Sequence, residues 1–119
     1  MEHRVEKVIS LMRGNLRRKL TLSEMARAVH LTPEHLCRVF KAETGSPPTK
    51  YFKSLRLLKA KELLETTSLS IKEITALIGV KDVSHFVRDF GAAYGLTPGR
   101  YRARHYSTTG KTAEINNGQ

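Results

Sequence analysis

The fold is decided by one stretch of sequence that occurs twice, as TLSEMARAVHLTPEHLCRVFKAETGSPPTKY over residues 21–51 and as SIKEITALIGVKDVSHFVRDFGAAYGLTPGRY over residues 70–101. Both copies close on the same Gly-x-x-Pro-x-x-Tyr pattern, which ends at Tyr51 and at Tyr101. Four residues of the first copy recur fifty positions later: His35, Arg38, Phe40 and Ala42 match His85, Arg88, Phe90 and Ala92. The chain therefore contains a duplicated structural unit.

Each copy has the pattern of two short helices joined by a turn. The first helix opens on a capping box, Thr21 with Glu24 and Ser70 with Glu73, in which a hydroxyl and a carboxylate bind backbone N–H groups. A second start signal follows in each copy, at Thr32-Pro33 and at Asp82. The predicted helices cover 22–29 and 33–44 in the first copy, and 71–78 and 83–93 in the second.

Helical periodicity continues outside the two copies. An apolar stripe predicts a first helix over 2–19, and a run that starts at Ser46-Pro47-Pro48 predicts a long helix to about Thr66. At 1.5 Å per residue that helix is about 27 Å long, so it can act as a rigid strut. A last short helix is expected to begin at 97–98. The expected core includes several leucines and isoleucines of the strut and of the helix after Ser70, namely Leu55, Leu58, Leu63, Leu64, Ile74, Leu77 and Ile78.

These elements predict an all-α, homeodomain-like fold of about seven helices. We expect a first helix-turn-helix subdomain over 1–49, a linker helix over 50–66 and a second helix-turn-helix subdomain over 67–106. Residues 107–119 are polar and without periodicity, which is typical of a disordered tail.

Composition narrows the function. The 119 residues carry a net charge of +10 and a pI near 10.1, which favours an anionic partner, with nucleic acid first. No apolar stretch approaches the roughly 20 residues that span a bilayer, and no signal peptide is recognisable. The single Cys37 forms no internal disulfide, so a reducing cytoplasm is expected. The five histidines form no ligand cluster, so we expect neither a metal nor another cofactor, and no group of residues suits catalysis.

With these motifs in this order, the chain resembles the AraC/XylS family of transcription regulators over about residues 5–105. The residues that carry the resemblance are Leu22-x-x-Met25-Ala26, Leu36-Cys37-Arg38-Val39-Phe40-Lys41, Gly45-Ser46-Pro47, Leu55-Arg56, Ala60, Leu63-Leu64, Ile71-x-x-Ile74, Gly79, Ser84-His85-Phe86-x-Arg88-x-Phe90, Gly95-Leu96-Thr97-Pro98 and Tyr101-Arg102. The resemblance implies that two helices, over 33–44 and 83–93, read successive major-groove segments of double-stranded DNA.

The same resemblance implies which residues meet DNA. Base contacts are expected from Glu34, Cys37, Arg38, Ser84, His85 and Arg88, with His35 as a weaker candidate. Arg38 and Arg88 suit the two acceptors of guanine, whereas Cys37 offers little beyond contact with a thymine methyl group. As a group, the basic residues Lys41, Lys50, Lys53, Arg56, Arg100 and Arg102 are candidates for phosphate contacts, and for any one of them a merely solvated side chain is the alternative. Two departures weaken the second copy as a binder, Gly91 where the first copy has Lys41, and Val80 where the family often has Phe.

The resemblance also implies RNA polymerase as a partner, since family members are most often activators, and it implies no membrane. The chain reads either as a stand-alone regulator or as the C-terminal part of a larger protein with a sensory domain. Two other functions fit the basic helical composition. One is an adaptor that binds acidic protein surfaces, and the other is a coating protein that binds nucleic acid without sequence preference.

Overall fold

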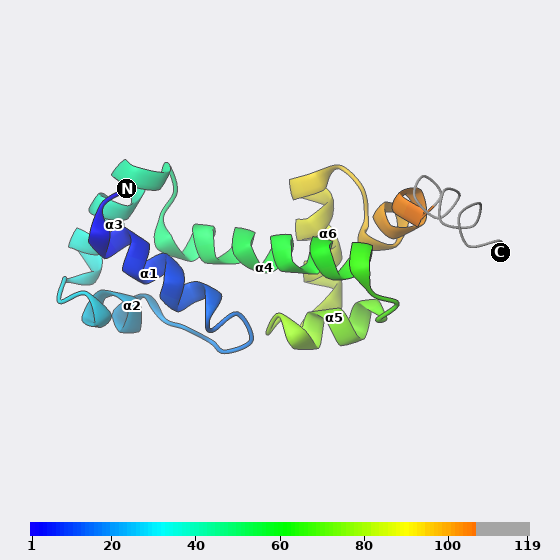
Figure 1. Ribbon diagram of the computed structural model, residues 1–119, viewed down its shortest axis with the longest axis horizontal. Helices are drawn as coiled ribbons and strands as arrows, with labels where there is room; N and C mark the ends of the chain where they lie inside the picture. Colours follow the sequence, from blue (N-terminus) through cyan, green and yellow to red (C-terminus); the bar gives the residue numbers. More distant parts are fainter. Residues whose placement is uncertain (107–119) are drawn as a thin grey trace. The chain divides into compact units, whose positions relative to one another are not determined.

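A computed structural model of the protein describes residues 1–106 (Figure 1). Within that range the chain forms helices and no strand, which confirms the predicted all-α fold. The helices are α1 (His3–Arg13), α2 (Leu22–Ala28), α3 (Pro33–Thr44), α4 (Pro48–Thr66), α5 (Ile71–Leu77) and α6 (Val83–Tyr94), followed by a helical segment over 98–106. The predicted tail over 107–119 lies outside the described residues.

The chain divides into two compact units, Met1–Arg56 and Leu57–Gln119, and the division falls inside α4. In the first unit α1, α2 and α3 pack around a core with the beginning of α4. The residues of this core are Val5, Val8, Ile9, Met12, Leu20, Met25, Ala26, Val29, Leu36, Phe40, Phe52 and Leu55.

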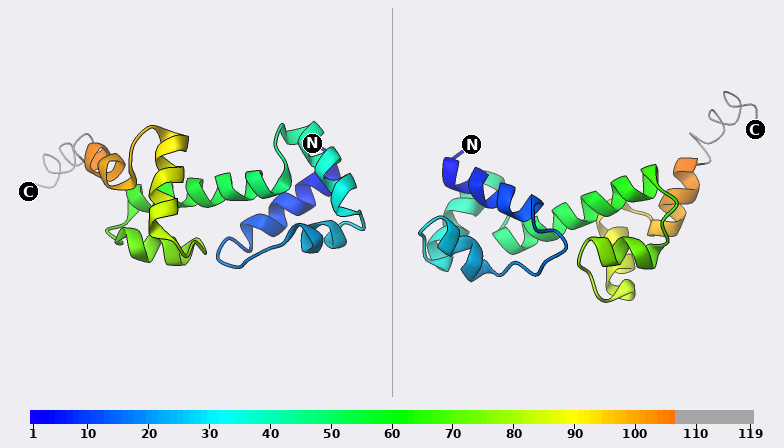
Figure 2. Two further views of the ribbon diagram at one scale, coloured as in Figure 1. Left: turned by 180° about the vertical axis from the view of Figure 1, so that it is seen from behind. Right: turned by 60° about the horizontal axis from the view of Figure 1, so that its bottom comes forward.

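The second unit repeats this arrangement with the second half of α4 in the place of α1. Figure 2 shows α5 and α6 against that part of α4 in both views. Their shared core consists of Leu57, Ala60, Leu64, Ile74, Ile78, Phe86 and Phe90. In each unit the aromatic ring in the second helix of the repeat meets the closing tyrosine edge-on, with ring centroids 5.2 Å apart for Phe40 and Tyr51 and 5.7 Å for Phe90 and Tyr101.

Both predicted capping boxes are confirmed. The Thr21 hydroxyl accepts the Glu24 N–H at 3.1 Å, and the Glu24 carboxylate accepts the Thr21 N–H at 3.0 Å. Ser70 and Glu73 form the same pair at 3.1 and 2.9 Å. Each box satisfies two N–H groups that a helix start leaves without partners, so the start of α2 and of α5 is fixed by local sequence.

The first helix is shorter than predicted. We expected it to reach residue 19, but α1 ends at Arg13, with Gly14 as its C-cap. The Asn15 side chain donates to the Leu11 carbonyl oxygen at 2.7 Å and so occupies an acceptor at the helix end. Glycine is a poor helix former and asparagine competes for backbone groups, so both residues favour termination here.

Two predicted core residues are exposed instead. Leu58 in α4 and Leu77 in α5 are 42% and 43% exposed. In α4 the buried side chains change from Leu55, which belongs to the first core, to Leu57, which belongs to the second, so one apolar stripe does not describe the whole helix. In α5 the side chain of Thr75 is buried although that of Leu77 is exposed. The Thr75 hydroxyl donates to the Lys72 carbonyl oxygen at 2.9 Å.

Candidate nucleic-acid interface

Each unit contains two helices joined by a turn with the same backbone geometry. His30 lies between α2 and α3 with a φ of 58°, and Gly79 lies at the matching position between α5 and α6 with a φ of 75°. The residue after each donates its N–H back into the preceding helix, Leu31 to Ala26 at 3.0 Å and Val80 to Thr75 at 2.9 Å. Histidine tolerates the left-handed conformation better than most residues, and glycine adopts it freely. Both units therefore form a helix-turn-helix.

The second helix of each pair, α3 and α6, is capped in the same way at both ends. The Thr32 hydroxyl accepts the His35 N–H at 3.1 Å, and the Asp82 carboxylate accepts the His85 N–H at 3.1 Å. This backbone hydrogen bond from His85 lowers the pKa of Asp82. At the other end, Gly45 and Gly95 are left-handed, with φ values of 83° and 79°. The two helices are thus matched elements of twelve residues each.

The buried face of each helix determines which residues remain exposed. Leu36 and Phe40 of α3, and Phe86 and Phe90 of α6, are almost completely buried. The opposite faces carry most of the predicted base-contacting residues, all of them exposed: Glu34, His35 and Arg38 on α3, and Ser84, His85 and Arg88 on α6. In each set the spacing i, i+1, i+4 places the side chains on one side of a helix.

Two of the predicted residues differ from this pattern. Cys37 is half-buried, so it is set back from the exposed face of α3. The His85 side chain lies 3.6 Å from the Asp82 carboxylate, measured from Nδ1 to Oδ2, and both side chains are more than half exposed. An imidazole in this position can pair with Asp82 or turn outward to a ligand.

Among the six predicted phosphate contacts, Lys41, Lys50, Lys53 and Arg100 are exposed. Arg56 is placed differently, because its guanidinium donates to backbone oxygens of its own unit. Nε reaches Leu16 at 3.0 Å and Nη2 reaches Arg18 at 2.8 Å, and the group lies 4.2 Å from the centre of the Phe52 ring. Burial lowers the pKa of Arg56.

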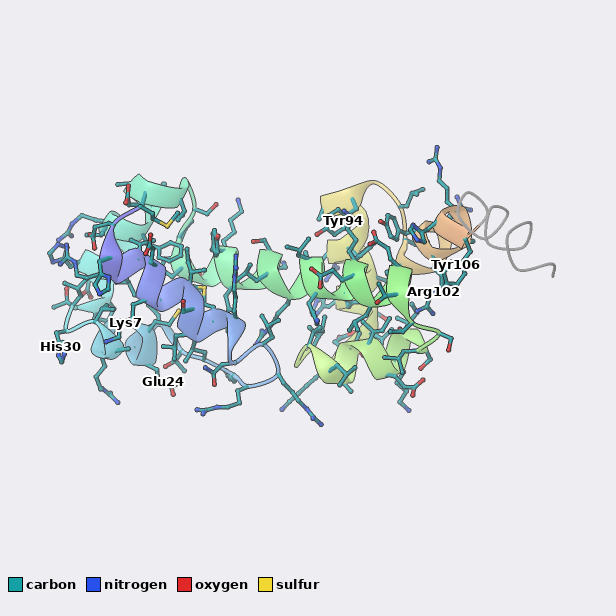
Figure 3. All side chains as sticks on the ribbon, viewed as in Figure 1. Lys7, Glu24, His30, Tyr94, Arg102 and Tyr106 are labelled. Carbon is teal, nitrogen blue, oxygen red and sulfur yellow. The ribbon has the colours of Figure 1, made fainter. Side chains whose placement is uncertain are left out.

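Arg102 is engaged still more fully by the protein itself. Its guanidinium donates to four carbonyl oxygens at the end of α4 and in the connection to α5: Leu63 at 3.5 Å, Leu64 at 3.2 Å, Thr67 at 3.0 Å and Leu69 at 2.5 Å. Figure 3 shows Arg102 beside this end of α4. No pattern in the sequence distinguishes Arg56 and Arg102 from the exposed arginines, so sequence reasoning missed these contacts.

Within residues 1–106, no group of three or more His, Cys, Asp and Glu residues could hold a metal ion. No helix of this part of the chain is long and apolar enough to cross a bilayer. Each unit thus presents the exposed face of its own second helix, α3 in the first and α6 in the second.

Known proteins share both the fold and the sequence pattern. A family model described as a helix-turn-helix domain matches residues 25–104. The crystal structure of an AraC-type transcriptional regulator from Chromobacterium violaceum is 32% identical, covers 86% of this chain and 91% of that chain, and superposes with a TM-score of 0.82.

Two curated proteins show how much of a relative the chain represents. The uncharacterised regulator YfiF of Bacillus subtilis is 36% identical over 105 residues, which are 88% of this chain and 33% of that protein. The lactose operon transcription activator of Staphylococcus xylosus is 28% identical over 107 residues, 90% of this chain and 38% of that protein. The chain thus spans well under half the length of these relatives. From its duplicated helix-turn-helix and these similarities, the chain belongs to the AraC-type family of helix-turn-helix DNA-binding domains.

Proposed function

We propose that this chain regulates transcription by binding double-stranded DNA at preferred sequences, with α3 and α6 each entering one major-groove segment. The observation that carries the proposal is the pair of exposed arginines, Arg38 and Arg88, at matching positions of two matched helices. The major groove is wide enough to admit a helix, and the second helix of a helix-turn-helix is the one that enters it. Recurrence of the arginine at equivalent positions of both units supports contact with DNA over a merely solvated side chain.

The chemistry of the exposed faces suggests a role for each residue. Arg38 and Arg88 can each make two hydrogen bonds to guanine O6 and N7. Glu34 can accept from a cytosine amino group, while His35, Ser84 and His85 can donate to bases or to nearby phosphates. Cys37 is half-buried, so it would contact a thymine methyl group only where the DNA approaches α3 closely.

Phosphate contacts are assigned to the exposed cations Lys41, Lys50, Lys53 and Arg100. Arg56 and Arg102 are left out, because their guanidinium N–H groups already bind backbone oxygens. The net charge of +10 supports attraction to a duplex of any sequence. Added salt weakens this attraction, and each phosphate contact makes the affinity fall more steeply with salt concentration. Base contacts then add the preference for one site.

The wider setting follows from the relatives. The similar protein of Staphylococcus xylosus is named a transcription activator, which supports activation here. As an activator, this chain would act in the cytoplasm and contact RNA polymerase. Because the curated relatives are much longer, a sensory segment is expected to work together with this chain in the whole protein. As a DNA-binding regulator, the chain would carry out no catalysis.

A selection experiment tests the proposal against its rivals. Preferred duplexes are selected from a random library with the 119-residue chain, and the affinity for selected and random duplexes is then titrated at several salt concentrations. We expect the selected site to be preferred by about a thousandfold or more. Negligible binding would favour an adaptor for acidic proteins, and equal binding to all duplexes would favour a nonspecific coating protein.

The first testable prediction concerns Arg38. Arg38→Ala should weaken binding to the selected site by about 1–3 kcal/mol and leave binding to random duplexes nearly unchanged, because a base contact is lost. The matched control is Lys50→Ala, which should weaken binding to every duplex and reduce the salt dependence. Both are measured by the same titration. An equal loss of affinity on both duplexes would make Arg38 a phosphate contact.

A further inference from the structure

The connection that precedes each helix-turn-helix is held by a side chain from the last helix of the same unit. In the first unit Arg56 Nη2 donates to the Arg18 carbonyl oxygen at 2.8 Å. In the second unit the Tyr106 hydroxyl donates to the Thr67 carbonyl oxygen at 2.7 Å. Positions 56 and 106 are fifty residues apart, like Tyr51 and Tyr101, and positions 18 and 67 are forty-nine apart, like the N-caps Thr21 and Ser70, so both pairs match in the repeat. The same hydrogen bond therefore occurs twice, once from a guanidinium and once from a phenol.

Arg102 strengthens this tie in the second unit. Its four acceptors are Leu63 and Leu64 in the last turn of α4 and Thr67 and Leu69 in the connection. The last carbonyl groups of a helix lack partners within the helix, and a cation placed there is favourable. The residue after Leu69 is Ser70, the N-cap of α5. One guanidinium thus joins the end of α4 to the start of the second helix-turn-helix.

A further contact ties the same helical segment to α4. The Tyr101 hydroxyl donates to the Glu65 carboxylate, and burial together with this hydrogen bond raises the pKa of Tyr101 to about 12. Segment 98–106 carries all three donors, namely Tyr101, Arg102 and Tyr106. It therefore holds the end of α4 and the connection to α5 through hydrogen bonds from three side chains.

We propose that Arg102 is a positioning residue, which sets the DNA affinity of the second helix-turn-helix without touching DNA. α5 and α6 share one core through Ile74, Ile78 and Phe86, so the place where α5 starts determines how α6 is presented. Freeing the connection lowers the fraction of molecules in the binding-competent arrangement, and the apparent affinity falls by the same factor. This inference rests on the proposed function, because it concerns binding to the selected site.

A positioning role and a phosphate contact predict opposite effects of replacing Arg102 by lysine. Lysine keeps the charge but offers one ammonium in place of a planar fork, and it cannot reach four carbonyl oxygens at once. Arg102→Lys should therefore weaken DNA binding almost as much as Arg102→Ala. A phosphate contact would tolerate lysine well, and its loss would reduce the slope of log affinity against log salt by about 0.9.

The experiment uses the 119-residue chain with Arg102→Ala, Arg102→Lys and the control Arg100→Ala, an exposed neighbour. Affinity is titrated at several salt concentrations on the selected site and on two versions with one segment scrambled. We expect both Arg102 variants to bind the full site about tenfold or more weakly with an unchanged salt slope, since several carbonyl groups lose their partner. The loss should disappear when the segment read by the second unit is scrambled. Arg100→Ala should reduce the slope.

Three results of this titration would overturn the inference: wild-type affinity of Arg102→Ala, rescue by Arg102→Lys, or a reduced salt slope for Arg102→Ala. Should Arg102→Ala fail to fold, Tyr106→Phe removes a single hydroxyl from the same connection, and it should weaken binding in the same way with the slope unchanged.

Amide hydrogen exchange without DNA separates this inference from the proposed function. Both Arg102 variants should lose protection in α5 and α6 and keep it in α2 and α3. Equal protection in wild type and variants would overturn the positioning role even if binding to DNA is sequence-specific. If the wild-type chain prefers no duplex, the proposed function fails, while this measurement still decides whether Arg102 holds the connection.

Discussion

Single side chains at helix ends determine where each helix-turn-helix begins. The pKa values of Glu24 and Glu73 are lowered because each carboxylate accepts the backbone N–H of its N-cap residue. A lowered folded-state pKa means that the carboxylate stabilises the fold above its ordinary pKa of 4.5. That stabilisation is lost as the pH falls through the folded-state value.

Replacing both carboxylates by amides should therefore reduce the loss of stability at low pH. The double variant Glu24→Gln with Glu73→Gln keeps a side-chain acceptor for the N-cap N–H but no longer titrates. Between about pH 5 and pH 3, the urea midpoint of the double variant should therefore fall less than that of wild type. Each single variant should fall between the two. Identical pH dependence of wild type and double variant would show that these carboxylates do not contribute.

The helix caps and the exposed arginines could be predicted from the sequence, whereas the contacts of Arg102 could not. The caps were predicted correctly because a capping box lies within four consecutive residues. The exposure of Arg38 and Arg88 also followed from the periodicity of the buried residues around them. The partners of Arg102 could not be predicted, because its acceptors lie more than thirty residues earlier in the chain and backbone oxygens carry no sequence signal.

The helix α6 contains a glycine at a position where its backbone does not need one. Gly91 lies inside α6, and a Cβ built on it would meet only the Leu96 carbonyl oxygen at 4.0 Å, an ordinary contact. Gly95, four residues later, ends the same helix with a φ of 79°. One glycine is thus dispensable for the backbone and the other is required by it.

The third prediction compares these two positions. Gly91→Ala should raise the free energy of unfolding by about 0.5–1 kcal/mol, since alanine is the better helix former. Gly95→Ala should lower it by about 1–2 kcal/mol, since an L-residue is strained in the left-handed conformation. Urea denaturation measures both. Destabilisation by Gly91→Ala would mean that α6 packs more closely at this position than the structure shows.

Helix existence was predictable and helix faces were less so. Every predicted helix within residues 1–106 is present, because caps, prolines and glycines mark the ends. The face of α4 was misjudged at Leu58, because the helix serves two cores and its apolar residues change partner after Leu55. The length of α1 was misjudged because an apolar stripe continued past Gly14, where the backbone stops being helical.

The two cores have no residue in common among those described. Phe40 and Phe90 are completely buried at matching positions, one in each core. Phe90 also contacts three other rings, those of Phe86, Tyr94 and Tyr101. Stability is consequently expected to be set separately in each unit.

The fourth prediction tests this separation with one substitution in each unit. Phe90→Leu should lower the protection of α5 and α6 amides against hydrogen exchange by roughly 1 kcal/mol or more, since part of a packed ring is lost. α2 and α3 should be nearly unaffected, and Phe40→Leu should give the reverse pattern. Equal loss throughout the chain would show that the two units unfold as one.

The hydrogen bond made by Arg56 in one unit and by Tyr106 in the other has a consequence for how such repeats diverge. The donor and the acceptor occupy the same places in both units, while the donating group is a guanidinium in one and a phenol in the other. Comparison by residue type would score this pair as a mismatch and overlook a shared bond. Because either a guanidinium or a phenol can donate here, the two units carry different groups at this position and still form the same hydrogen bond.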